Sequence, residues 1–231
     1  MTFIEIRKFV SWASLLLMLT TSSVLLGQAN SITEFSLSSN VASPQQITLG
    51  PDGALWFTES NAVGRITTTG IISEFPLPTR AFPSGITQGP DGALWFTNPD
   101  ILGKIDRITT SGDLIEYIIP NVPEFSVPAG ITTGPDKALW FTIQEANAIG
   151  RVTTDGNFTQ YIIPAGLNLI FGSEPRDIIT GPDGALWFTE TSGNSIGRIT
   201  TDGIITEHPL PTPNARPIKI TVGPDLALWF T

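Results

Sequence analysis

The stretch Gly181-Pro182-Asp183-Gly184-Ala185-Leu186-Trp187-Phe188-Thr189 decides the fold, because close copies of it recur along the chain. The Trp-Phe-Thr triplets of five copies lie at 56–58, 95–97, 140–142, 187–189 and 229–231. Their tryptophans are spaced 39, 45, 47 and 42 residues apart. Self-similarity at this period is typical of repeat architectures, in which one small unit is stacked many times. Most of the conspicuous residues are therefore structural, and function is sought where the copies differ.

Each unit contains four short β-type runs, which in the fourth unit are 175–180, 185–189, 194–200 and 204–209. The Asp-Gly pair between the first two runs predicts a type I′ hairpin turn, since glycine tolerates positive φ angles. Lys137 and Leu226 replace this glycine in units three and five. They predict either a different loop or about 1 kcal/mol of strain from a left-handed non-glycine residue.

The repeat predicts an all-β fold, namely a β-propeller of four-stranded antiparallel blades with five units present and the last one incomplete. A linear solenoid is the alternative, but solenoids of this period are helical and no helical periodicity follows residue 29. The Trp and Phe of each unit are expected to pack between neighbouring blades. Stacking on carbohydrate is the alternative use of these rings.

The first 29 residues form a separate segment. Arg7 and Lys8 precede an apolar run from Phe9 to Leu26, and the small residues of 27–29 follow. We predict a secretory signal peptide over 1–29, cut after Ala29, and propeller repeats over 30–231. A retained membrane anchor is the alternative, because the run approaches the length that spans a bilayer. The mature protein is thus expected to be secreted or periplasmic, with no membrane span after cleavage.

Composition narrows the possible partners. The net charge of −9 and the lack of a basic stripe argue against nucleic-acid binding. The chain has no cysteine, which excludes disulfides, a thiol nucleophile and a Cys-ligated zinc site. A small-molecule or peptide ligand on the central face of a monomer is the expected partner.

The two ends of the repeat region also carry predictions. The run 31–35 matches the fourth run of later units, which predicts an outer strand that completes the last blade and removes exposed edges. The sequence stops at Thr231, before the third run that every earlier unit has. This predicts a C-terminally truncated sequence.

The units Ile-Thr-x-Gly-Pro-Asp-Gly-Ala-Leu-Trp-Phe-Thr-Glu and Asn-x-Ile-Gly-Arg-Ile-Thr-Thr resemble the virginiamycin B lyase (streptogramin lyase) family over residues 31–231. The resemblance implies a seven-bladed full-length propeller and a magnesium-dependent lyase that opens cyclic depsipeptide antibiotics at the ester by elimination. It further implies a histidine base, a metal that polarises the substrate, and glutamates that hold the site. Elimination beside a carbonyl needs such a base and such an electrophile.

In a propeller, the loop before the inner strand and the loop after the second strand open on one face, near the axis. The resemblance places two histidines in the first loop type, directly after a proline, with a glutamate two residues before the second. Ile218 occupies the position of the first histidine and cannot take a proton, so the chain as written is expected to be inactive. Catalytic and metal residues stay unassigned. The remaining ligand-face candidates are Gln45, Glu59, Ser84, Asn98, Gln144, Arg176 and Glu190.

Several residues have competing interpretations. Glu59 and Glu190 offer oxygen ligands of the kind magnesium prefers, or they are a solvent-exposed feature of the repeat. His208 stands where other units have Phe or Tyr, which favours packing over catalysis. The aspartates of Gly-Pro-Asp and the glycines before the arginines are interpreted as turn residues. The candidate functions are a streptogramin-type lyase, a non-catalytic binding propeller, and a hydrolase of lactones or phosphate esters.

Overall fold

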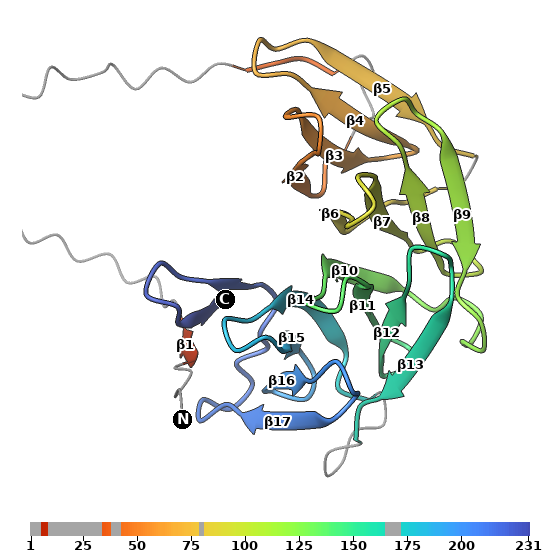
Figure 1. Cartoon of the computed structure of the whole chain (residues 1–231). Coiled ribbons are helices and arrows are strands. Elements are labelled where there is room, and N and C mark those ends of the chain that lie inside the picture. The colour runs from red at the N-terminus through yellow and green to blue at the C-terminus, as the bar shows by residue number, and fades with distance from the viewer. Residues whose placement is uncertain (1–5, 9–33, 38–42, 79–80, 165–171) are drawn as a thin grey trace, which may run out of the picture.

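The computed structural model describes residues 6–8, 34–37, 43–78, 81–164 and 172–231. Every helix or strand assigned within these ranges is a β-strand. Four sheets are four-stranded and antiparallel, and a fifth sheet has three strands. Figure 1 shows them as successive blades of an open arc, with the first strand of each complete blade on the concave side. The predicted all-β propeller of antiparallel four-stranded blades is confirmed.

The blades follow the chain in order and have the following strands. The first has β2 (Ile47–Leu49), β3 (Leu55–Glu59), β4 (Ala62–Ile66) and β5 (Ile72–Pro76). The second has β6 (Ile86–Gln88), β7 (Leu94–Asn98), β8 (Lys104–Ile108) and β9 (Leu114–Ile118). The third has β10 (Pro128–Thr133), β11 (Leu139–Ile143), β12 (Ala148–Val152) and β13 (Phe158–Ile162). The fourth has β14 (Pro175–Thr180), β15 (Leu186–Glu190), β16 (Ser195–Ile199) and β17 (Ile205–Pro209).

The fifth sheet consists of β18 (Ile220–Val222), β19 (Leu228–Phe230) and β1 (Ile6–Lys8), and β1 runs parallel to β19. Apart from β1, the predicted signal peptide lies outside the described residues. Of the predicted strand at 31–35, only 34 and 35 are described, and no strand is assigned to them. In the described part of the chain no helix has the length and apolar character needed to cross a membrane.

The Gly-Pro-Asp-Gly hairpin differs in type from the prediction. In the first blade Gly53 donates its N–H to Gly50 O, and Gly50 donates to Ala54 O at 2.8 Å. Only Gly53 has a positive φ, of 75°, whereas a type I′ turn needs two such residues. The connection is a type I turn followed by one left-handed residue. Lys137 (φ 59°) and Leu226 (φ 62°) keep this turn and adopt the strained backbone, as one of the two alternatives predicted.

The turn aspartates do more than shape the turn. In the third blade Asp136 accepts hydrogen bonds from Trp140 Nε1 at 2.9 Å and from Arg151 Nε at 2.7 Å. Burial favours a raised pKa for Asp136, but these donors outweigh it and hold the pKa below its ordinary value. The same network recurs in the other complete blades, on Asp52, Asp91 and Asp183. Each aspartate thus ties the turn to the second and third strands.

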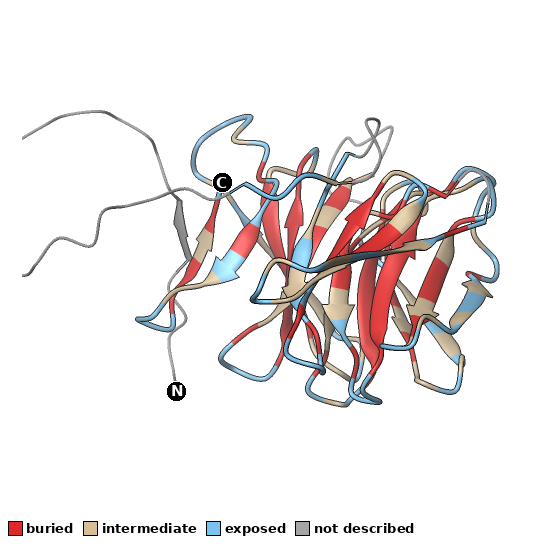
Figure 2. Cartoon of the chain, turned by 90° about the horizontal axis from the view of Figure 1, so that it is seen from above, coloured by how far each residue is buried: buried red, intermediate tan, exposed pale blue. Residues whose placement is uncertain are grey.

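The tryptophans and phenylalanines fill the space between blades, as predicted. Trp56 of the first blade packs in one cluster with Phe96 of the second, and Trp140 of the third with Phe188 of the fourth. Figure 2 shows this buried layer running through the middle strands of the blades. The glycine before the arginine is not a turn residue. Gly64 lies in mid-strand opposite Phe57, whose ring would be 2.1 Å from any Cβ added there.

An aromatic residue of each outer strand stacks on its blade's tryptophan. Phe75 lies parallel to Trp56, with ring centroids 5.3 Å apart, and also lies against Gly112 of the next blade. His208 takes this place in the fourth blade, 5.3 Å from the Trp187 ring, so its predicted packing role is confirmed. Phe35 lies against Gly70 as Phe75 lies against Gly112.

Candidate functional site

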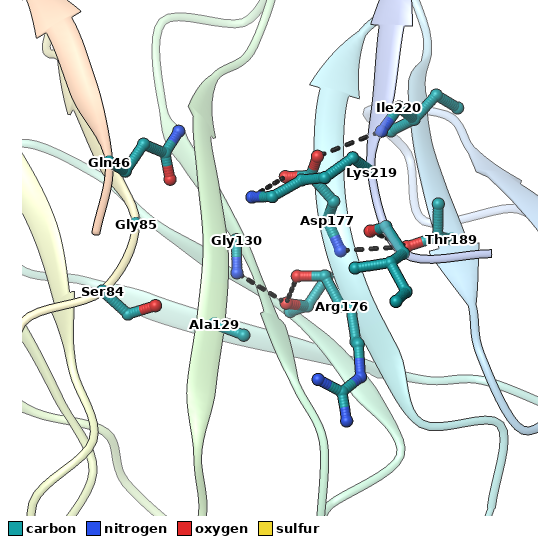
Figure 3. Close-up of polar contacts among 12 residues, drawn as sticks. Gln46, Ser84, Gly85, Ala129, Gly130, Arg176, Asp177, Thr189, Lys219 and Ile220 are labelled. Atoms are coloured by element: carbon teal, nitrogen blue, oxygen red, sulfur yellow. Dashed lines mark hydrogen bonds and ion pairs between the residues drawn. The ribbon is translucent and has the colours of Figure 1, made fainter. Parts of the chain in front are cut away.

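The axial site is built on the first residues of the inner strands, and the threonine of Leu-Trp-Phe-Thr fixes their backbone. Thr142 Oγ1 accepts the Gly130 N–H at 3.0 Å and donates to Arg176 O of the next blade at 2.9 Å. Figure 3 shows Ala129 and Arg176 at the start of the inner strands β10 and β14, and Ser84 just before the inner strand β6. Thr58, Thr97 and Thr189 make the same two bonds.

The next position along each inner strand sets how closely the blades approach. A Cβ on Gly130 would lie 2.7 Å from Arg176 O, so the backbones touch there. Asp177 replaces this glycine in the fourth blade, and its Oδ2 accepts the Ile220 N–H at 3.1 Å. Burial raises the pKa of Asp177, and Lys219, with Nζ 3.8 Å from Oδ1, opposes the rise. Figure 3 shows both contacts.

Arg176 is the charged candidate on this face, and it has an acidic partner that sequence reasoning missed. Its guanidinium pairs with Glu174, and Ser192 Oγ donates to the other Glu174 oxygen at 2.6 Å. The Ser192 hydroxyl and Arg176 hold the pKa of Glu174 below its ordinary value. Glu174 stands two residues before Arg176. The family resemblance gives the same spacing for a glutamate and a histidine, so this spacing could have identified Glu174 from the sequence.

Glu59 and Glu190 are buried, with exposed fractions of 2% and 0%. The Glu59 carboxylate oxygens have no hydrogen-bond partner, whereas the Glu190 carboxyl interacts with Ser173 and Glu207. Burial raises the pKa of both, that of Glu190 to about 8, and the neighbouring Glu207 carboxylate adds to the rise at Glu190. The interpretation as solvent-exposed repeat features is wrong, and ligand contact by these two carboxylates is not supported.

Asn98 is buried as well and acts as a brace. Its Oδ1 accepts the Phe82 N–H at 3.1 Å, and its Nδ2 donates to Asp106 at 2.8 Å. Asp106 was also missed by sequence reasoning. It stands where three other blades have a mid-strand glycine, and burial raises its pKa to about 7.

The remaining candidates are accessible. Gln45 is exposed and donates to Ser43, while Ser84 and Gln144 are partly buried. Ile218 is 48% exposed, and its N–H donates to Thr231 O at 2.7 Å. Of the predicted face, the structure places Ser84 and Arg176 two blades apart, with Ala129 between them, and leaves Glu59, Asn98 and Glu190 in the blade interiors.

The described residues do not by themselves indicate a magnesium site. No group of three or more histidine, aspartate or glutamate side chains is placed to hold a metal within the described ranges. The buried carboxyl groups of Glu59 and Glu190 lie in different blades, at β3 and β15. No chemical step is therefore assigned to a metal.

Comparisons with known proteins agree with this architecture. The model of the virginiamycin B lyase family matches residues 24–125 and 103–231. A catalytically inactive variant of virginiamycin B lyase from Staphylococcus aureus, solved with quinupristin, is 48% identical with a TM-score of 0.81. That match covers 88% of this chain and 68% of the other chain. A streptogramin B lyase structure is 42% identical with a TM-score of 0.78, covering 86% of this chain and 65% of its own.

A curated virginiamycin B lyase from Bordetella parapertussis is 50% identical over 44 residues. This alignment covers 16% of this chain and 15% of that relative. The chain therefore spans only part of the proteins it resembles.

Proposed function

Since the chain belongs to the virginiamycin B lyase family, we propose that it is a secreted propeller that binds a cyclic depsipeptide on its central face. The observation that carries the proposal is the match to a lyase solved with quinupristin, at 48% identity over 88% of this chain. The first residues of the inner strands, whose backbone is held by the threonine hydrogen bonds, would then form the floor of the ligand site. Arg176 would contribute a positive charge to this site.

The reaction that goes with this family resemblance is a magnesium-dependent elimination that opens the ester of the ring. Taking an α-proton requires a base within hydrogen-bonding reach of the substrate. Ile218 stands where the resemblance places a histidine, and its half-exposed side chain has no group that accepts a proton. We therefore propose that the chain as written binds the substrate without opening it.

The two candidates are therefore the family's lyase activity and non-catalytic binding of a ligand or a protein, and the second is the one proposed. Ile218 favours it, because an apolar side chain at this exposed axial position contributes to binding but not to proton transfer. Antibiotic resistance would then require sequestration of the ligand instead of its degradation.

Liquid chromatography with tandem mass spectrometry separates these possibilities, because the linear elimination product differs from the intact ring in retention time and fragmentation although their masses are equal. Quinupristin is incubated with the full chain, with and without magnesium, and binding is measured in parallel by calorimetry. Elimination opens the ring without changing its mass, whereas hydrolysis adds one water. We expect binding and an intact ring for the wild type. Ring opening by the wild type would refute the inactivity, and absent binding would refute the choice of ligand.

Secretion and monomeric state are separate proposals. Expression with the native N-terminus, followed by sequencing of the exported protein, tests for a mature chain that begins after Ala29. Light scattering on the purified protein tests for a monomer.

A further inference from the structure

Four large apolar side chains lie exposed beside one another on loops of the second and third blades. Phe82, Ile101, Leu102 and Phe125 are 58%, 47%, 49% and 64% exposed. They line one pocket of about 540 Å³, called the apolar pocket below. Single exposed apolar residues are ordinary on protein surfaces, but contiguous ones mark binding sites.

The loops that form the apolar pocket adjoin residues of the candidate ligand face in the sequence. Phe82 precedes Ser84 by two residues in the loop before β6, and Phe125 lies in the loop before β10. Ile101 and Leu102 lie in the loop after β7, directly beyond Asn98. These are the two loop types that open on the axial face of a propeller.

Specific contacts hold the pocket in shape. Asn98 fixes the Phe82 backbone, and the Phe125 N–H donates to Ile101 O at 3.1 Å. Phe125 has a φ of 65°, a left-handed conformation that is unusual for a bulky residue. Backbone strain of this kind persists where the surroundings enforce it and is common in ligand clamps.

The charge and size of the pocket indicate its occupant. Asp100 also lines it, but its carboxylate pairs with Lys104 Nζ at 2.8 Å and accepts the Leu102 N–H at 2.9 Å. An uncharged ligand group is therefore favoured. The volume lies within the ~300–1,000 Å³ of small-ligand pockets, whereas a stable protein interface takes about 20–30 residues a side.

We propose that the apolar pocket binds an aromatic ring of a compact, uncharged ligand group, held between Phe82 and Phe125. Offset or edge-on contact between aromatic rings supplies attraction beyond area burial. The ligand is the cyclic depsipeptide of the proposed function, on which this assignment rests. The pocket would then favour those members of that ligand class that present an aromatic ring to it.

Calorimetric titration of quinupristin into the full chain tests the proposal with two pocket variants. Phe82→Ser removes one ring, and Phe125→Gly removes the other while retaining the left-handed backbone. Ile115→Ser on the outer strand β9 is the matched control, since Ile115 is 45% exposed and lies outside the pocket. We expect both pocket variants to bind at least tenfold more weakly and the control to bind like the wild type, with all melting temperatures preserved.

The outcomes separate the pocket from the proposed function. Equal quinupristin affinity in all four proteins overturns the pocket assignment and leaves the proposed function standing. If quinupristin does not bind, the proposed function fails, and NMR titration with N-acetyl-phenylalanine amide decides the pocket: binding that both variants lose supports it, and no binding overturns it. If the wild type is a dimer and Phe125→Gly is a monomer, the apolar pocket is an interface with a second copy of the chain. That result would also overturn the proposal.

Discussion

Asp106 should make the stability of the second blade depend on pH in a calculable way. Its side chain is fully buried, and one carboxylate oxygen has no partner while the other accepts from Asn98. Burial raises its pKa to about 7, with Asn98 opposing and the Glu116 carboxylate adding to the rise. The folded protein therefore keeps a proton that the unfolded chain loses near pH 4.

The sign and size of the pH dependence of stability follow from the difference in the pKa of Asp106 between the folded and the unfolded chain. The raised pKa contributes its full stability below pH 4, and that contribution is lost as the pH rises to about 7. A change of one in pKa corresponds to ~1.36 kcal/mol. The rise of about three in the pKa of Asp106 therefore corresponds to about 4 kcal/mol in the free energy of unfolding. Asp106→Asn preserves the shape of the protonated acid and cannot titrate. Between pH 4 and pH 8, the free energy of unfolding of Asp106→Asn should therefore rise by about 4 kcal/mol relative to that of the wild type.

Urea denaturation followed by tryptophan fluorescence, at several pH values, measures this difference. Buried groups such as Glu190 titrate in both proteins and cancel in the comparison. Asp202→Asn is the control, because Asp202 lies on an exposed turn of the fourth blade, away from Asp106. A free-energy difference between wild type and Asp106→Asn that stays constant with pH would refute the reasoning.

Three further predictions concern the repeat. Lys137→Gly should raise the free energy of unfolding by about 1 kcal/mol, since glycine relieves the left-handed backbone; a lower midpoint in urea would contradict this. Thr142→Val should lower it by about 1–3 kcal/mol because buried bonding partners lose the hydroxyl, and an unchanged midpoint would show that the bridge adds nothing. His208→Phe should retain the stacking on Trp187 and leave stability and quinupristin binding unchanged in denaturation and calorimetry, whereas lost binding would give the histidine a direct role.

The repeat allowed much of the fold to be predicted. Its period gave the strand order, and the fixed register of the aromatic residues gave the packing between blades. The turn type was wrong because a dipeptide does not reveal how many residues take a positive φ, and only Gly53 does. The interpretation of the glycine in mid-strand was wrong because its cause is a ring on the neighbouring strand, at Phe57.

The candidate site was less predictable. The burial of Glu59 could have been predicted, since alternation places it on the same face as Phe57. The brace formed by Asn98 and Asp106 could not, because it depends on a carboxylate that replaces a repeat glycine only in the second blade. The apolar pocket likewise joins loops that are about 40 residues apart.

The threonine bridge described for Thr142 and its counterparts has a consequence for how this architecture varies. The bridge links one blade only to the next, and its chemistry is the same at each of the four junctions described. The threonine bridge is the same wherever it occurs in the series, so the bridge alone does not set the number of blades. A duplicated or deleted unit would find compatible neighbours on both sides, and the number of units in a ring must be limited by curvature instead.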